Sequence, residues 1–311
     1  MTKKKFKYYS KKRDMRNFIF SIIPIVLFLD VAIAQESPIS ASKKERVHKV
    51  IIDSIEREYY IHIPKNRKAN APLVFVFHGY SGSALNINND NKFNQIANQN
   101  GFVVCYPQGL TDEKGKAFWQ VGYNFHKNLK VNDVKFVKIL THFLQNEYNL
   151  SKNNVFITGF SNGGDFCNLL SCQTEGVFKA AAPIISCFMK EFYDQCEEAK
   201  AIPIFMLNGT QDQITFWDGD MANQQGYGAY LPTVDMIGFR THQINYDIRK
   251  RDTILSKSAK DKTLIAIDRY MNSKTNNQVW MYKVINGGHG HPIYLDIEKE
   301  IWRFFSLYLE N

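Results

Sequence analysis

Residues 155–163 of this chain read VFITGFSNG, an apolar run that leads into a serine flanked by glycines. The apolar run predicts a buried strand, and residues Asp165 to Cys172 predict a helix. A serine on a sharp turn between a strand and a helix has an exposed hydroxyl and lies at the positive end of the helix dipole. Glycines at 159 and 163 fit this turn, because side chains there would crowd the neighbouring strand and helix. The pattern predicts that Ser161 is a nucleophile.

An acid and a histidine follow Ser161 in the chain order that a serine hydrolase of this architecture requires. Residues 202–207 (IPIFML) predict a buried strand, and Asp212 stands just beyond its end. Residues 279–284 (VWMYKV) predict another strand, and His289 lies in the glycine-rich loop that follows it. Ligands bind at the carboxyl ends of the strands in an open α/β sheet, so we expect the three side chains to meet there.

These side chains predict acyl transfer through a covalent intermediate. Ser161 would attack a carbonyl carbon while His289 takes its proton and later returns it to the leaving alcohol. Asp212 would hold the imidazole tautomer and stabilise the imidazolium. Asp218 and Asp220 are the alternative acids, and His291 is the alternative base. Each lies further along its loop than the residue with which it competes.

The oxyanion of the tetrahedral intermediate needs backbone N–H donors. One is predicted at Asn162, the residue after the nucleophile. The second should come from the loop after an earlier strand, and residues 78–83 (HGYSGS) occupy that place. We expect the N–H of Tyr80 to be this donor, with Gly79 or Ser81 as alternatives.

The rest of the pattern predicts an α/β-hydrolase fold. Residues 48–64 alternate apolar and polar side chains on both sides of Asp53-Ser54, which predicts an opening antiparallel hairpin. Strands are then expected at 73–77, 102–106, 155–158, 180–185, 202–207 and 279–284, and helices at 91–100, 132–148, 165–172 and 297–309. Such alternation predicts a mostly parallel sheet covered by helices on both faces.

Two long segments, residues 108–130 and 213–239, fit no regular element. Their aromatic side chains and one histidine are Trp119, Tyr123, Phe125, His126, Phe216, Trp217, Tyr227 and Tyr230. Loops of this length inside a compact domain are usually functional. We expect them to form walls of the substrate cleft above the nucleophile, with Trp119, Trp217 and His291 as candidate contacts.

The N-terminus predicts an export signal, because a basic stretch precedes an apolar run and the small residues 32–34 form a cleavage site. We expect a signal peptide at 1–34 with cleavage after Ala34, a linker at 35–46 and a catalytic domain at 47–311, with Met15 as an alternative start. The mature protein would be secreted or periplasmic. An uncleaved membrane anchor is the alternative, but the apolar run is short for a bilayer span. No stable membrane insertion is expected after cleavage.

The formal charge of +9 comes largely from the N-terminus. Residues 1–34 hold eight of the 39 Lys and Arg and two of the 30 Asp and Glu, which leaves 31 basic and 28 acidic residues, a charge of +3. This is an ordinary surface balance. No basic stripe with interleaved aromatic residues is present, and a nucleic-acid partner is not expected.

Five cysteines in an exported chain allow at most two disulfides. Cys167 and Cys172 are expected on different faces of one helix, which disfavours a bond between them. Cys196 is the best candidate for a bridge, to Cys172 or to Cys187. Cys105 lies in an apolar run and is expected to be a free thiol.

The motifs resemble those of secreted α/β-hydrolase esterases, the group of polyhydroxybutyrate depolymerases, feruloyl esterases and acetyl xylan esterases. The resemblance covers roughly residues 45–309 and is carried by PLVFVFHG (72–79), NDV (132–134), GFSNGG (159–164), AAP (181–183), NGTQD (208–212) and GGH (287–289). It implies Ser161, Asp212 and His289 as nucleophile, acid and base, a carboxylic ester as substrate, and no metal or organic cofactor. Many relatives have Trp-Pro soon after the histidine, where this chain has Gly290-His291-Pro292.

The expected function is therefore that of a serine esterase acting on feruloyl or acetyl esters of plant xylan, because aromatic rings can stack on sugars or on a phenolic ring. A polyhydroxybutyrate-type polyester depolymerase is the alternative. A serine peptidase is disfavoured, because peptidases of this fold commonly carry an additional large domain that filters substrates. A catalytically inactive binding protein is disfavoured by the complete set of catalytic residues. The sequence predicts no oligomeric state.

Overall fold

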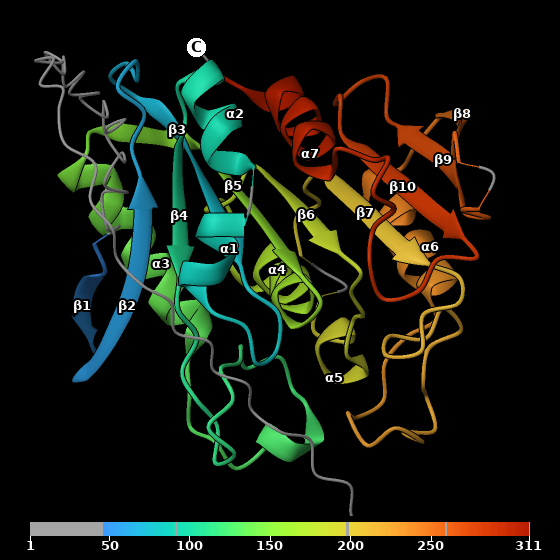
Figure 1. Ribbon diagram of the computed structural model, residues 1–311, viewed down its shortest axis with the longest axis horizontal. Coiled ribbons are helices and arrows are strands. Elements are labelled where there is room, and N and C mark those ends of the chain that lie inside the picture. The colour runs from blue at the N-terminus through green and yellow to red at the C-terminus, as the bar shows by residue number, and fades with distance from the viewer. Residues whose placement is uncertain (1–45, 91, 197–198, 259, 311) are drawn as a thin grey trace, which may run out of the picture. The chain divides into compact units, whose positions relative to one another are not determined.

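The computed structural model divides into two units, residues 1–44 and 45–311. It describes residues 46–90, 92–196, 199–258 and 260–310 (Figure 1). The expected signal peptide at 1–34 and the expected linker, except for residue 46, lie outside the described residues. The architecture below is that of the second unit.

A ten-stranded sheet runs through the described part of this unit, in the order β1-β2-β4-β3-β5-β6-β7-β10-β9-β8 (Figure 1). The strands are β1 (His48–Ile52), β2 (Ile55–His62), β3 (Ala71–Phe77), β4 (Val103–Pro107), β5 (Leu150–Phe160), β6 (Ala180–Ile184), β7 (Ile204–Gly209), β8 (Ile248–Leu255), β9 (Leu264–Met271) and β10 (Gln278–Ile285). The six central strands run parallel to one another, and in spatial order they are β4, β3, β5, β6, β7 and β10. Antiparallel pairs form both edges. The expected α/β class and parallel centre are confirmed.

The predicted opening hairpin is confirmed by the pairing of β1 with β2. Its register runs from His48 opposite Tyr59 to Ile52 opposite Ile55. The two turn residues, Asp53 and Ser54, have φ values of 52° and 63°. Positive φ at both positions is what a two-residue hairpin turn needs to match the twist of its strands.

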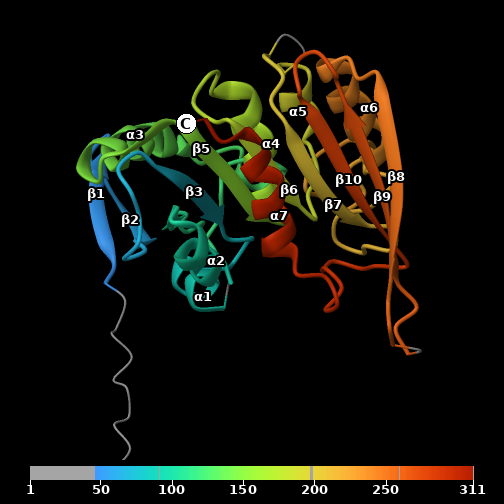
Figure 2. The same ribbon diagram turned by 90° about the horizontal axis from the view of Figure 1, so that it is seen from above.

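Helices cover both faces of the sheet (Figure 2). On one face lie α1 (Ala84–Asp90), α2 (Phe93–Asn100) and α7 (Ile297–Phe305), and on the other α3 (Asp133–Glu147), α4 (Asn162–Gln173) and α6 (Thr233–Ile244). The short helices are α5 (Lys190–Tyr193), η1 (Asn124–His126) and η2 (Ser306–Tyr308). None of the helices within the described ranges is long and apolar enough to cross a membrane.

Each face of the sheet has its own hydrophobic core, and β3 contributes to both. Successive side chains of a strand point to opposite faces. Leu73, Phe75 and Phe77 therefore pack under α3 and α4, whereas Val74 and Val76 pack under α2 and α7. The continuous apolar run that predicted this strand is explained by burial on both sides.

A buried ion pair joins the hairpin to α3. Arg57 in β2 donates to Oδ1 of Asp133 over 2.6 Å, and the two side chains are 3% and 0% exposed. The other carboxylate oxygen accepts the N–H of Gln120 at 2.8 Å. A second pair between the same elements, Lys135 with Asp53, has the same 2.6 Å separation but lies about half exposed.

Part of the C-terminal half differs from the predicted pattern. Segment 213–239 was expected to be irregular, but α6 begins within it at Thr233. The antiparallel strands β8 and β9 were not predicted. A disulfide joins Cys172 at the end of α4 to Cys196, whose Cα atoms lie 5.2 Å apart, so Cys172 is the partner of the two that the sequence left open. Cys105, Cys167 and Cys187 are free and buried.

Candidate active site

Ser161 stands on a strained turn between β5 and α4. Its φ and ψ are 54° and −125°, a conformation that residues other than glycine rarely adopt. The Ser161 N–H donates to the carbonyl of Ile184 at 2.9 Å and anchors the turn to β6. A Cβ atom at Gly163 would lie 2.4 Å from the carbonyl oxygen of Phe77, so only glycine fits there. The turn therefore holds the Ser161 side chain out from the edge of the sheet.

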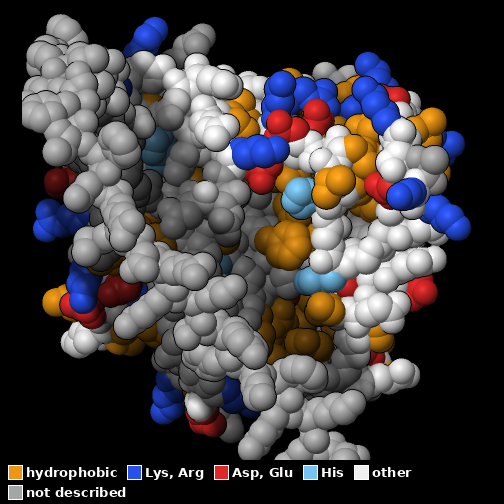
Figure 3. Space-filling model, viewed as in Figure 1, with side chains coloured by type: hydrophobic (Ala, Val, Ile, Leu, Met, Phe, Trp, Pro, Cys, Tyr) orange, Lys and Arg blue, Asp and Glu red, His pale blue; other side chains and the backbone are white. Residues whose placement is uncertain are grey.

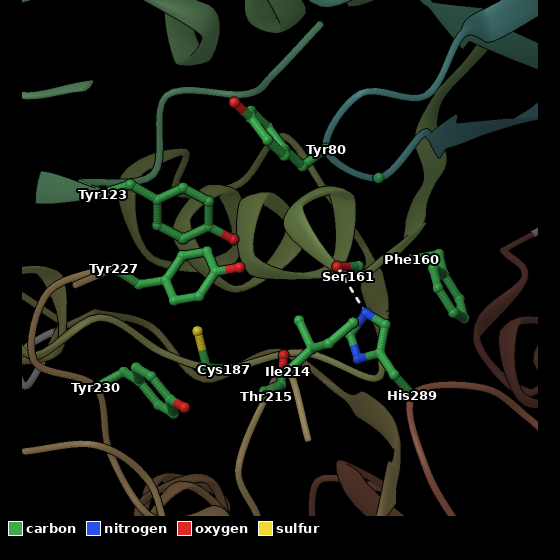
Figure 4. Close-up of a pocket in the computed structure, with 11 residues that line it drawn as sticks. Tyr80, Tyr123, Phe160, Ser161, Cys187, Ile214, Thr215, Tyr227, Tyr230 and His289 are labelled. Carbon is green, nitrogen blue, oxygen red and sulfur yellow. Dashed lines mark hydrogen bonds between the residues drawn. The ribbon is translucent and has the colours of Figure 1, made fainter. Parts of the chain in front are cut away.

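The structure brings Ser161, His289 and Asp212 together in one hydrogen-bonded series. Nε2 of His289 lies 3.0 Å from Oγ of Ser161, the contact drawn as a dashed line in Figure 4. Nδ1 of His289 lies 2.8 Å from Oδ2 of Asp212. A carboxylate can only accept here, so Nδ1 carries the proton and Nε2 is left as the acceptor for the serine hydroxyl.

Hydrogen bonds from its own loop fix the Asp212 carboxylate. The side chain is 1% exposed, and Oδ1 accepts the N–H groups of Ile214 and Thr215 at 2.8 and 2.9 Å. Both oxygens are thus occupied, which leaves the carboxylate one orientation toward His289. The geometry is that of a positioned base held by a buried acid.

The rival residues lie elsewhere. The Asp220 carboxylate accepts the N–H groups of Gln224 and Gln225 and shapes its own loop. Asp218 is exposed. His291 is also exposed, and its Nδ1 lies 3.4 Å from the carbonyl oxygen of Pro292. Of the candidate acids and bases, only His289 is bonded to the Ser161 hydroxyl and only Asp212 is bonded to His289 within the described residues.

The loop after β3 lies against the serine. A Cβ atom at Gly79 would be 3.4 Å from the Cβ of Ser161. The N–H of Ser81 is already bonded to the carbonyl of Ala117 at 2.7 Å, which excludes Ser81 as an oxyanion donor. Within the described ranges, the N–H groups of Tyr80 and Asn162 donate to no other residue. Both are available to a ligand atom beside Ser161.

A cavity of about 290 Å³ opens beside the serine (Figure 4). Its lining consists of Gly79, Tyr80, Tyr123, Phe160, Ser161, Cys187, Ile214, Thr215, Tyr227, Tyr230 and His289. The hydroxyl groups of Tyr123 and Tyr227 point into it, whereas that of Tyr80 points away from Ser161 (Figure 4). In Figure 3, hydrophobic side chains line a hollow next to histidine side chains. Both long segments contribute tyrosine rings to the cavity, as expected.

The three residues expected to contact substrate do not line this cavity. Trp119 is fully buried, and its ring stacks on Phe166 with centroids 4.9 Å apart. Trp217 is half-buried beneath the ammonium group of Lys283, 4.6 Å from the ring centroid. His291 lines two neighbouring hollows outside the cavity. The Trp119 prediction is corrected: this ring belongs to the core, because the segment that carries it turns inward to meet α4.

A buried carboxyl group that the sequence pattern did not predict, that of Asp165, lies beneath the cavity. Oδ2 of Asp165 accepts the Tyr123 hydroxyl at 2.5 Å, and Oδ1 accepts the N–H of Cys187 at 2.7 Å. Burial raises the pKa of Asp165 to about 6, although both hydrogen bonds act in the opposite direction. The only sequence signal was an acidic residue in the first turn of a helix, which is common.

The described residues contain no cluster of three or more His, Cys, Asp or Glu side chains that could hold a metal ion. The chemistry of the site is that of an activated hydroxyl, a base and two free N–H donors. Such a set can attack an acyl carbon and stabilise the oxyanion that forms.

A model of the prolyl oligopeptidase family matches residues 90–262, more than half of the chain. Among curated proteins, the chain is 27% identical over 158 residues to a bifunctional acetylxylan esterase/xylanase of Neocallimastix patriciarum, which covers 51% of this chain and 22% of that protein. It is 29% identical over 154 residues to feruloyl esterase B of Piromyces equi, 49% of this chain and 28% of that protein. Acetylxylan esterase A of Talaromyces purpureogenus is 26% identical over 182 residues, 57% and 46% of the two chains. The chain thus spans less than half the length of these relatives.

Solved structures share the fold. An acetyl xylan esterase from Aspergillus awamori superimposes with a TM-score of 0.59 at 14% identity, covering 84% of this chain and 99% of that one. An S-formylglutathione hydrolase from Agrobacterium tumefaciens superimposes with a TM-score of 0.57 at 11% identity, covering 85% and 95%. At such identities the likeness shows the fold alone, and the expected α/β-hydrolase architecture is confirmed.

Proposed function

The chain belongs to the prolyl oligopeptidase family, and within it we propose that the protein is an exported serine esterase acting on feruloyl-type esters of plant polysaccharide. The observation that carries this proposal is the hydrogen-bonded series of Ser161, His289 and Asp212 beside a pocket walled by tyrosine rings. Similarity to a feruloyl esterase and to acetylxylan esterases supports an ester as substrate.

The reaction would proceed in two halves through an acyl-enzyme. Ser161 Oγ attacks the acyl carbon while its proton passes to Nε2 of His289, and the Asp212 carboxylate stabilises the imidazolium at Nδ1. When the tetrahedral intermediate collapses, His289 gives the proton to the departing alcohol oxygen, and the acyl group remains on Ser161 as an ester. Water then loses a proton to His289, attacks the acyl carbon and releases the free acid and the Ser161 hydroxyl.

The N–H groups of Asn162 and Tyr80 would stabilise the oxyanion of both tetrahedral intermediates. Asn162 is the first residue of α4, so the positive end of the helix dipole lies at the same point. Donors that are already free and oriented need no reorganisation when the charge develops, which makes them effective in a partly dry site.

The pocket supports an aromatic acyl group. Its volume of about 290 Å³ lies near the lower end of the range for small-molecule sites, about 300–1,000 Å³, and a two-carbon acetyl group would leave most of it empty. Rings of Tyr123, Tyr227 and Tyr230 can pack edge-on or offset against a phenolic ring. An acetyl ester is the second candidate, because several relatives are named acetylxylan esterases.

A peptidase reaction is the alternative from another class, and the name of the matching family model favours it. The same serine and histidine could cleave an amide, since His289 would protonate the leaving amine as it does an alcohol. The three curated relatives named above carry esterase names, which favours an ester over a peptide.

The test compares the purified protein with Ser161→Ala on methyl ferulate, acetylated xylan, poly-3-hydroxybutyrate and a proline-containing peptide. We expect release of ferulate by the wild type and loss of about 10⁶-fold in kcat in Ser161→Ala, the scale seen when a triad serine is removed. If acetate is released from acetylated xylan faster than ferulate from methyl ferulate, the preferred acyl group is acetyl. Cleavage of the peptide or polyester alone, or equal rates in the two proteins, would reject the proposal.

A further inference from the structure

Trp119 connects the two loops that carry the proposed oxyanion donors. Its indole Nε1–H donates to the carbonyl oxygen of His78 at 2.9 Å. Its backbone N–H donates to Oδ1 of Asn162 at 2.7 Å, and its carbonyl accepts from Nδ2 of the same side chain at 3.1 Å. All three residues are 0% exposed, so water cannot replace any of these bonds. One residue therefore holds both loops at once.

The ring of Trp119 is fixed by the same two elements. It stacks on Phe166 of α4 with an interplanar angle of 1°. It also meets the ring of Phe77, the last residue of β3, edge-on at a centroid distance of 5.2 Å. β3 leads into the loop that carries Tyr80, and α4 begins at Asn162. Packing and hydrogen bonding thus fix the same relationship, that between the end of β3 and the start of α4.

We propose that Trp119 is a positioning residue that sets the separation between the N–H groups of Tyr80 and Asn162. The proposal rests on the proposed function, because it gives these two groups their role as oxyanion donors. Trp119 touches neither the cavity nor the reacting atoms. It acts through His78 on one side and through the Asn162 side chain on the other.

The segment that contains Trp119 makes further bonds to the loop after β3. Nε2 of His78 accepts the N–H of Gly109 at 2.9 Å, and the ring can accept because burial lowers the pKa of His78 to about 4. The Tyr80 hydroxyl donates to Oδ2 of Asp112 at 2.6 Å. These contacts place the segment as a support for the whole loop.

Such a support has a chemical reason. The loop after β3 has no helix or strand hydrogen bonds of its own between Gly79 and Ser81. A donor in an unsupported loop must be reoriented as the oxyanion forms, whereas a preorganised donor costs nothing at that moment. A misplacement of about 1 Å can lower a rate about 100-fold. The position of the Tyr80 N–H therefore depends on what holds the loop.

The test replaces the indole N–H without removing the ring. Trp119→3-benzothienylalanine substitutes sulfur for the N–H and keeps the shape, whereas the genetically encoded Trp119→Phe removes the N–H together with part of the ring system. We expect kcat for methyl ferulate to fall about 10- to 100-fold in both, with KM changed less than about two-fold. The affinity for an arylboronic acid, which forms a tetrahedral adduct on the serine, should fall in parallel, whereas the affinity for ferulate should not.

The matched control is Trp302→Phe. Trp302 is also buried, at 8% exposure, and stacks on Phe102 on the opposite face of the sheet, away from both loops. Trp302→Phe should keep the wild-type kcat while it loses about as much thermal stability as Trp119→Phe. An unchanged kcat in the benzothienyl variant, a loss confined to KM, or an equal loss of kcat in Trp302→Phe would overturn the inference while the esterase assignment stands. A wild-type protein without Ser161-dependent hydrolysis would overturn both.

Discussion

The hydroxyl group of Tyr123 donates a hydrogen bond to Oδ2 of Asp165, so a ring in the wall of the pocket is tied to a carboxyl group buried at the start of α4. This bond makes the two tyrosines that point into the pocket unequal. The Tyr227 hydroxyl makes no hydrogen bond to another described residue, although the Tyr227 carbonyl accepts the N–H of Asn124 at 2.7 Å. Removing the Tyr123 hydroxyl leaves the buried Asp165 carboxyl group without its donor. Removing the Tyr227 hydroxyl leaves no buried group unsatisfied.

We therefore expect Tyr123→Phe to lower the free energy of unfolding by about 1–3 kcal/mol, the cost of an unsatisfied buried acceptor. Tyr227→Phe should change it by less than about 0.5 kcal/mol. Urea unfolding of both variants followed by circular dichroism measures the difference. Equal losses in the two variants would mean that the Tyr123–Asp165 bond contributes nothing specific.

Asp165 should also make stability depend on pH. Its pKa of about 6 in the folded protein lies above the ordinary value of 3.8, so the folded state binds this proton more tightly than the unfolded state does. The stabilisation is fully present below pH 3.8 and is lost as pH rises to about 6. A shift of two pKa units corresponds to about 3 kcal/mol.

The measurement is the free energy of unfolding of the wild type and of Asp165→Asn at pH 4 and pH 7. Between these pH values the wild type should lose about 2.5 kcal/mol more than the variant, because the asparagine cannot titrate and the unfolded carboxyl group is already partly ionised at pH 4. Other titrating groups contribute equally to both proteins and cancel in the comparison. Parallel pH profiles would show that the carboxyl group titrates near its ordinary pKa.

Asp212→Asn should lower kcat about 10⁴-fold, the loss recorded when the triad aspartate of a serine protease is replaced by asparagine. The amide would donate to Nδ1 of His289, which forces the proton onto Nε2 and leaves no acceptor for the Ser161 hydroxyl. Asp220→Asn is the matched control in the same loop, because the Asp220 carboxylate accepts the N–H groups of Gln224 and Gln225 and, within the described ranges, has no bond to His289. Steady-state kinetics on methyl ferulate measures kcat of both variants. A larger loss of kcat in Asp220→Asn than in Asp212→Asn would show that Asp220 is the catalytic acid.

The two ion pairs between the hairpin and α3 should differ sharply in their effect on stability. Asp133→Ala leaves the Arg57 guanidinium buried without a partner, which should cost about 3–5 kcal/mol. Lys135→Ala breaks an exposed pair of the same 2.6 Å length and should cost at most about 1 kcal/mol. Chemical unfolding at low and high salt measures both, and only the second should respond to salt. Similar costs would refute the argument from burial.

The residues around the serine could be predicted because their constraints are local or follow from strand order. Glycine at 163 is required by backbone that passes within contact distance, and the VFITGFSNG pattern records that requirement in consecutive positions. Asp212 and His289 stand 51 and 128 residues from Ser161, but each follows a recognisable apolar strand. Parallel strands end at one edge, so the order of elements was enough to bring the three together.

Trp119 and β8 could not be predicted, for two different reasons. An aromatic residue in an irregular segment can turn toward a cleft or toward the core, and the contacts that turn Trp119 inward come from distant residues, such as Asn162, 43 residues away, and Phe166. β8 is an edge strand with the sequence IRKRDTIL, exposed along nearly its whole length. Charged edge strands lack the apolar alternation that signals a strand, because their role includes discouraging pairing with other chains.

The backbone of Ser161 is held at a φ of 54°, where glycine would be at ease and serine is not. Such a conformation costs of the order of 1–3 kcal/mol for a residue with a side chain. Stability of the folded chain therefore favours glycine at position 161, whereas the proposed reaction requires serine there. Selection for thermal stability alone, without selection for activity, would therefore favour Ser161→Gly, which gives a more stable protein without its nucleophile.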